Sequence, residues 1–79
     1  MSIDVFIKNF AEQFDETELS IFCPELVFRD IDEWSSLTAL SVIAMVDDKY
    51  GVRLTGDDIS ISKTVEDIYN IVESKLDHK

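Results

Sequence analysis

Cysteine and histidine are almost absent from this chain: Cys23 and His78 are the only ones among its 79 residues. An intramolecular disulfide therefore cannot form, and the usual zinc sites lack their ligands. A self-acting serine hydrolase would also need a positioned base, and the one imidazole lies in the C-terminal tail. We expect no metal site, a buried or half-buried, inert thiol at Cys23 and a cytoplasmic, reducing environment.

Basic residues and long apolar runs are also scarce. Seven lysines and arginines stand against seventeen aspartates and glutamates, for a formal charge of -10. Such a charge repels phosphate backbones and anionic membranes and attracts basic protein surfaces. No apolar run approaches the roughly 18 residues that span a bilayer, and the first residues do not form a signal peptide. We therefore expect no nucleic-acid partner and no membrane insertion.

What is present is apolar periodicity of the helical kind in three stretches. The first stretch has Ser2 as its expected cap and comprises Ile3, Phe6, Ile7, Phe10 and Phe14. The last stretch follows a capping-box variant at Thr64 and Asp67 and comprises Val65, Ile68, Tyr69, Val72 and Leu76. The central stretch has Leu37, Leu40, Ile43, Ala44 and Tyr50 along one side, with Val46 at its margin, and this side is predicted to face the core. Ser35 or Ser36 is its expected N-cap, and Gly51 its expected end.

Two connections join these helices. Residues 15–34 lack periodicity but are rich in apolar side chains, so this long loop should pack against the domain and contain a turn of helix. After Gly51, residues 55–58 read as a turn, and the stretch around Ile59 and Ile61 is compatible with one helical turn or none. The prediction is one all-α domain over residues 1–79, a small bundle of three main helices plus one short helix. Its core should contain Phe6, Phe10, Leu40, Ile43, Ile68 and Val72.

Local chemistry by itself favours structural roles. Two hydroxyls at a helix start are a natural N-cap, although a phosphate attached there would also meet free amides and the positive end of the helix dipole. The acidic clusters at 30–33 and 57–58 lack the ligand spacing of a calcium loop and are expected to be solvated. Trp34 is expected to anchor the long loop.

A family resemblance adds to this interpretation. Residues 28–37 (FRDIDEWSSL), 47–54 (DDKYGVRL) and 64–68 (TVEDI) resemble the acyl carrier proteins, and the resemblance extends over about residues 19–72. In that family a serine of an Asp-Ser-Leu motif, at the start of the second helix, carries a 4'-phosphopantetheine arm whose thiol holds acyl groups as thioesters. Ser36, followed by Leu37, matches that serine.

The resemblance implies a monomeric carrier rather than an enzyme, with fatty acid or polyketide biosynthesis as the class of pathway. A phosphopantetheinyl transferase would attach the arm to Ser36 with magnesium, and acyl-loading and acyl-processing enzymes with basic patches would dock beside it. The expected docking residues are Trp34, Ser35, Leu37, Thr38, Ser41, Met45, Asp47 and Asp48.

One position departs from the family pattern. Ser35 stands where the family usually has aspartate, so a carboxylate that would help organise the metal and the transferase is missing. With this departure, the chain resembles a specialised carrier more than a housekeeping one. Two alternatives stay open: an aminoacyl or peptidyl carrier, and an unmodified interaction module that keeps the carrier fold.

Overall fold

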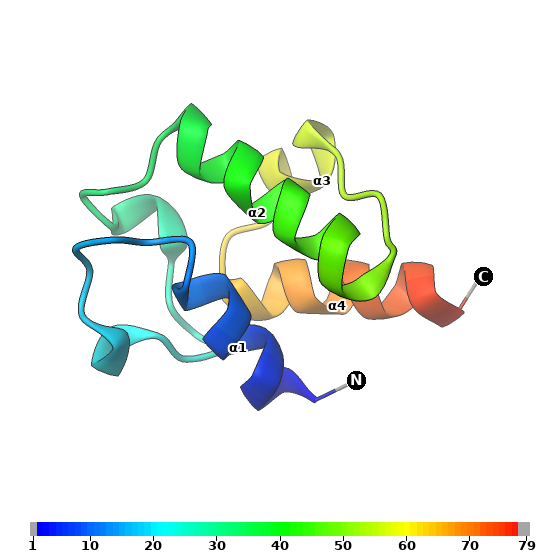
Figure 1. Cartoon of the computed structure of the whole chain (residues 1–79), viewed down its shortest axis with the longest axis horizontal. Helices are drawn as coiled ribbons and strands as arrows, with labels where there is room; N and C mark the ends of the chain where they lie inside the picture. The colour runs from blue at the N-terminus through cyan, green and yellow to red at the C-terminus, as the bar shows by residue number, and fades with distance from the viewer. Residues whose placement is uncertain (1, 78–79) are drawn as a thin grey trace.

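Four helices in the order α1, α2, α3 and α4 make up the computed structural model, which describes residues 2–77 (Figure 1). The bounds are Ile3–Ala11 for α1, Ser36–Tyr50 for α2, Gly56–Ser60 for α3 and Val65–Asp77 for α4. Within the described residues the only β pairing is one isolated bridge, between Val27 and Thr64. The predicted all-α bundle of three main helices and one short helix is confirmed. His78, the imidazole considered above, lies outside the described residues.

The core forms where α1 packs against both α2 and α4. Phe6 and Phe10 are fully buried on α1, one turn apart. The ring of Phe6 lies 5.9 Å from that of Tyr50 on α2 and 5.6 Å from that of Tyr69 on α4. Aromatic pairs at such distances stabilise by about 0.5–1.5 kcal/mol each beyond their burial, so α1 joins the other two helices largely through rings.

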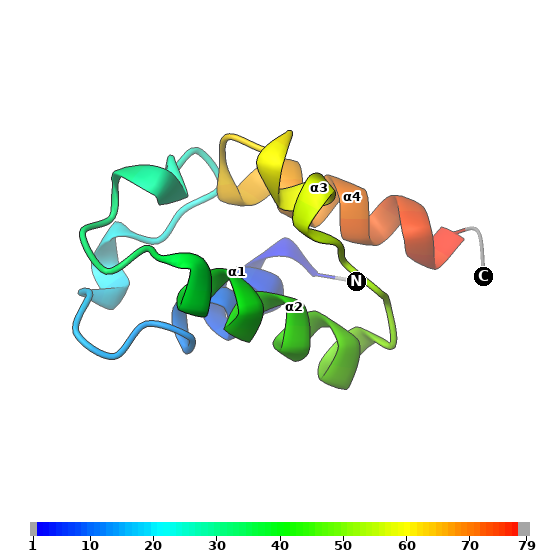
Figure 2. The ribbon, with the colours of Figure 1, turned by 90° about the horizontal axis from the view of Figure 1, so that it is seen from above.

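The connection between α1 and α2 covers one end of the bundle (Figures 1 and 2). It contains two short 3₁₀ turns, Leu19–Ile21 and Phe28–Asp30, in place of the single helical turn expected. Phe28 is fully buried, and its ring lies 4.6 Å from that of Trp34. The amide of Val65 donates to the carbonyl of Leu26 at 3.1 Å, which attaches the connection to the start of α4. The predictions of a packed loop and of Trp34 as its anchor are confirmed.

Polar caps set the helix boundaries. Ser2 caps α1, and Gly51 ends α2 in the left-handed conformation with φ 64°. Thr64 and Asp67 exchange side-chain to backbone hydrogen bonds at the start of α4, as the capping-box variant predicted. Thr55 and Asp58 make the same reciprocal pair at the start of α3. Residues 55–58, predicted as a turn, are therefore the first turn of a helix that this box stabilises.

The predicted inward face of α2 is wrong. Leu37 and Leu40 are 74% and 60% exposed, and Ala44 is exposed as well. The buried residues of α2 are Thr38, Val42, Met45 and Val46. Both sets have helical spacing, but at about 100° per residue they lie on opposite sides of the helix. Leu40 is accordingly not a core residue. Of the other predicted core residues, Phe6, Phe10, Ile68 and Val72 are buried and Ile43 packs half-buried against them.

Candidate functional site

Ser36 is the first residue of α2 and is exposed. Its neighbour Ser35 is the N-cap: the Ser35 Oγ accepts a hydrogen bond from the amide of Thr38 at 3.3 Å. Within residues 2–77, no hydrogen bond involves the Ser36 side chain, so its hydroxyl is open to solvent. The two adjacent serines thus have different roles, because one hydroxyl stabilises the helix end and the other is available to a partner.

Thr38 fixes the start of α2 to the preceding loop. Its Oγ1 donates to the carbonyl of Glu33 at 3.0 Å and lies 3.2 Å from the Oγ of Ser35. Only 9% of Thr38 is exposed. The structure therefore removes Thr38 from the predicted docking surface, because the residue is buried and its hydroxyl is bonded to the carbonyl of Glu33.

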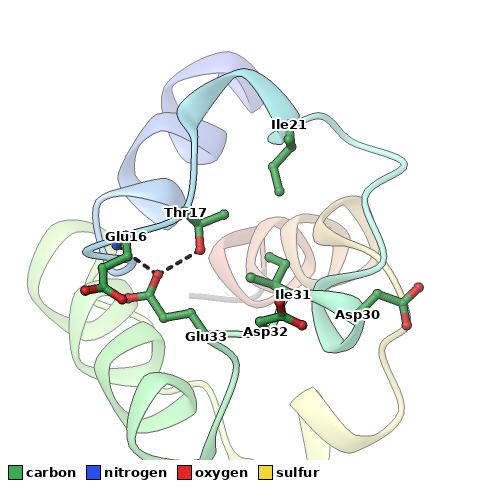
Figure 3. Close-up of a pocket in the computed structure, with 7 residues that line it drawn as sticks. All are labelled: Glu16, Thr17, Ile21, Asp30, Ile31, Asp32 and Glu33. Atoms are coloured by element: carbon green, nitrogen blue, oxygen red, sulfur yellow. Dashed lines mark hydrogen bonds between the residues drawn. The ribbon is translucent and has the colours of Figure 1, made fainter.

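The Glu33 side chain holds the loop that follows α1 (Figure 3). One carboxylate oxygen, Oε1, accepts from the Thr17 hydroxyl at 2.7 Å and from the Glu16 amide at 3.0 Å. The other, Oε2, accepts from the Asp15 amide at 2.6 Å. The Thr17 hydrogen bond, with further help from these backbone amides, outweighs desolvation and lowers the pKa of Glu33 below its usual 4.5. The prediction that residues 30–33 are merely solvated is wrong for Glu33.

A cavity of about 540 Å³ lies beside this carboxylate, lined by acidic side chains together with Thr17, Ile21 and Ile31 (Figure 3). The acidic lining residues are Glu16, Asp30, Asp32 and Glu33. Over the described part of the chain, no three histidine, cysteine or acidic residues form a group that could hold a metal ion. Ser36 is not among the residues that line this cavity.

Ser36 opens instead onto a cleft between α2 and α3. A cavity of about 380 Å³ is lined by Ser35, Ser36, Leu40 and Ile43 on one side and by Gly56, Ile59 and Ser60 of α3 on the other, with Trp34 and Arg29 among its further residues. A second cavity of about 400 Å³ shares Leu40 and Ile43 and extends along α2 to Asp47 and Arg53. Each is within the range of about 300–1,000 Å³ typical of small-molecule pockets. We call these two adjoining cavities the α2–α3 cleft.

The other predicted docking residues divide into exposed and buried ones. Leu37, Asp47 and Asp48 are exposed, while Ser41 and Trp34 are half-buried. Met45 is only 5% exposed and belongs to the core, so the prediction of an accessible Met45 is wrong. Its neighbour in the same helical repeat, Val42, is buried as well, because this side of α2 faces α1.

Sequence reasoning missed three functional features. Leu40 was assigned to the core although it lines the cleft, and neither Glu33 nor Arg29 was given a structural role. The second apolar set, Val42, Met45 and Val46, was the available signal for the orientation of α2. No local pattern gave a signal for the contacts of Glu33 and Arg29, since their partners lie 16 to 33 residues away.

Comparison with protein-family models, curated proteins and solved structures finds no match to this chain. None of the helices described over residues 2–77 has both the length and the apolar content required to cross a bilayer.

Proposed function

We propose that this protein is an acyl carrier that holds pathway intermediates as thioesters on a 4'-phosphopantetheine arm attached to Ser36. The observation that carries the proposal is the position of Ser36: an exposed hydroxyl without an internal partner, at the N-terminus of a fifteen-residue helix and at the mouth of the α2–α3 cleft. A phosphodiester at this place would lie near the first amides of α2, where a negative charge is favourable. The residues present therefore fit the group.

The attachment step is the transfer of a phosphopantetheine group from coenzyme A to Ser36. The Ser36 Oγ forms a bond to the phosphorus that carries the pantetheine chain in coenzyme A, the bond from that phosphorus to the bridging oxygen breaks, and 3',5'-adenosine diphosphate leaves. The hydroxyl proton passes to a base of the transferase, because none of the described residues that line the cavity with Ser36 is a general base. Once attached, the arm supplies a thiol for thioester formation, and the chain's own part is to present Ser36 and to shelter the cargo.

The cleft supports a cargo with an apolar part. Leu40, Ile43 and Ile59 line it, and burying apolar surface there would stabilise a tethered chain by about 25 cal/mol per Å². We propose that the part of the cargo nearest the arm enters between α2 and α3. An aminoacyl or peptidyl carrier would share the arm, but its polar cargo would gain less from this lining.

The docking surface for partner enzymes combines apolar and acidic residues on the outer side of α2. Leu37 and Leu40 are exposed there, and Asp47 lies about two to three turns further along. We propose that a phosphopantetheinyl transferase and acyl-loading and acyl-processing enzymes with basic patches bind this surface to the monomeric carrier in the cytoplasm. The same surface supports the second candidate, an unmodified interaction module, which the serine at position 35 also favours.

Intact mass after incubation with coenzyme A, magnesium and a broad-specificity transferase tests the proposal. We expect an increment of one phosphopantetheine group in the parent and in Ser35→Ala, and no increment in Ser36→Ala. Ser35→Ala is the matched control because it removes a hydroxyl one residue away. Its lost cap bond should cost about 1 kcal/mol of stability without removing the attachment site. An unmodified parent under several transferases would contradict the proposal and favour the interaction module.

Ser35→Asp sharpens the test. Aspartate also serves as an N-cap, so the helix start should be preserved while the family's carboxylate is restored. We expect a faster modification rate with a transferase that uses this carboxylate. An unchanged rate would mean that the transferase does not depend on it.

A further inference from the structure

Helix α3 forms one wall of the α2–α3 cleft, yet it is too short to be stable by itself. It has five residues, Gly56–Ser60, and only Ile59 is buried. Isolated helices below about 12 residues are marginal in water even in favourable sequences. Its position must therefore come from contacts with the rest of the protein, and it packs against α4.

Two basic side chains hold the two ends of α3. At the first end, the Lys75 Nζ on α4 lies 2.6 Å from the Asp58 Oδ2 and donates to the carbonyl of Arg53 at 2.8 Å. At the second end, the Arg29 guanidinium donates to three carbonyls: Ser62 at 2.5 Å, Ile59 at 2.7 Å and Ser60 at 3.2 Å. Basic side chains at a helix C-terminus satisfy carbonyls that have no partner in the helix.

The Arg29 contact is the one that bears on the cleft, because Arg29 lines it together with Ser36. Its guanidinium carbon lies 4.9 Å from the ring centre of Phe28, which is fully buried. The arginine is thus fixed to the packed loop and α3 is fixed to the arginine. Ser62 is 2% exposed, so without Arg29 its carbonyl would lose a charged donor in a place that water reaches poorly.

We infer that Arg29 is the positioning residue that fixes the C-terminal end of α3 opposite α2 and thereby limits the size of the apolar group that the cleft admits. The inference rests on the proposed function, since the group in question is a chain tethered at position 36. Loss of the three hydrogen bonds frees this end of α3 to move away from Leu40 and Ile43. The cleft then accepts longer chains and holds short chains less firmly.

The test uses chains attached chemically, so it does not need a transferase. In a Cys23→Ser, Ser36→Cys background, alkyl methanethiosulfonates from ethyl to decyl each form one mixed disulfide at position 36 and release methanesulfinate. The melting temperature of each product is measured, together with amide hydrogen exchange at residues 59–62. Cys23→Ser is required because Cys23 is an exposed free thiol, so the prediction that it is buried or half-buried is wrong.

In this background we expect the melting temperature to rise with chain length and to stop rising at the chain that fills the cleft. Arg29→Met should speed amide exchange at residues 59–62 about tenfold or more, since hydrogen bonds to a charged donor are lost. In the same variant the melting temperature should continue to rise to a longer chain before it reaches its plateau. Arg29→Lys keeps the charge but not the planar fork, so it should give intermediate values and also serves if Arg29→Met folds poorly.

Lys8→Met is the control, because it removes an exposed cationic side chain of α1 that lines neither cavity of the α2–α3 cleft. It should leave both the exchange rates and the plateau as in the background. The inference is overturned if the plateau falls at the same chain length in all four proteins, if Arg29→Met exchanges like the control, or if no chain raises the melting temperature. If a transferase fails to modify Ser36 with coenzyme A, the proposed function is contradicted instead. The comparison of chemically attached chains still tests the role of Arg29, because it does not depend on that modification.

Discussion

The two sides of α2 are both apolar, yet only one of them belongs to the core. The inner side, with Val42, Met45 and Val46, packs on α1, while the outer side, with Leu37 and Leu40, borders the cleft or faces solvent. Large exposed apolar side chains in a contiguous patch are usual at interaction sites and unusual elsewhere. The difference indicates that the inner side stabilises the fold, and it leaves the outer side exposed for the binding proposed above.

Truncation on the two sides should separate these roles, and this is the largest effect that we expect. Met45→Ala should lower the free energy of unfolding by about 2–5 kcal/mol because it leaves a cavity in the core. Leu40→Ala, on the outer side, should change it by no more than about 0.5 kcal/mol. Denaturant unfolding of both variants measures the pair. Similar losses in both would contradict the assignment of the two sides.

The Glu33 carboxylate attaches the loop after α1 to the residues just before α2, so acid should loosen this connection. Because the folded-state pKa of Glu33 is lowered below 4.5, its contribution to stability is complete above that value. It is lost as the pH falls through the folded-state pKa. Asp58 and Asp67 should add to this loss of stability in acid, because their pKa values are also lowered. At Asp58, desolvation is outweighed by hydrogen bonds from Lys75 and Thr55. At Asp67, hydrogen bonds from the amides of Thr64 and Lys63 lower the pKa most.

Glu33→Gln isolates the Glu33 part of this pH dependence. The amide cannot accept all three hydrogen bonds, so the variant should be less stable than the parent at neutral pH. The difference should shrink as the pH falls from neutral through the lowered folded-state pKa of Glu33, where the parent carboxylate becomes protonated. Thermal unfolding across this range measures it, with Glu66→Gln on exposed α4 surface as the control. A constant difference at every pH would show that the charge of Glu33 is not the cause.

The acidic residues near the end of α2 should have the smallest effect, and on rates rather than on stability. Replacing Asp47 and Asp48 by asparagine should slow association with a basic partner enzyme at low salt and leave dissociation nearly unchanged, because peripheral charges act by long-range attraction. Stopped-flow binding to the transferase at several salt concentrations provides the measurement. The control is the double variant Asp4→Asn, Glu66→Gln, which removes two negative charges elsewhere on the surface. An equal slowing in this control would show that the net charge, and not the position of Asp47 and Asp48, sets the association rate.

The site could be predicted from the sequence to the extent that its parts are local. A pair of serine hydroxyls at the start of a helix followed from neighbouring residues, and so did the glycine at the other end of that helix. Local residues did not distinguish the capping Ser35 from the exposed Ser36, which only the structure separates. The cleft could not be predicted in this way, since it needs α3 to stand opposite α2. That placement depends on Arg29 and Lys75, whose partners on and around α3 are distant in the sequence.

The sequence by itself determined the helical class, the starts of α1 and α4 and the glycine that ends α2, because periodicity and capping act within one or two turns of a helix. The end of α1 was predicted wrongly, since the apolar periodicity continues to Phe14 whereas the helix ends at Ala11. Only the tertiary structure decided which apolar side of α2 is buried. Both sides satisfy the helical spacing, and the choice is made by the volume that α1 offers to Val42, Met45 and Val46. Leu37 and Leu40 then stay outside, beside Ser36, where the shape of the cleft is set by residues that contact α3 across the fold.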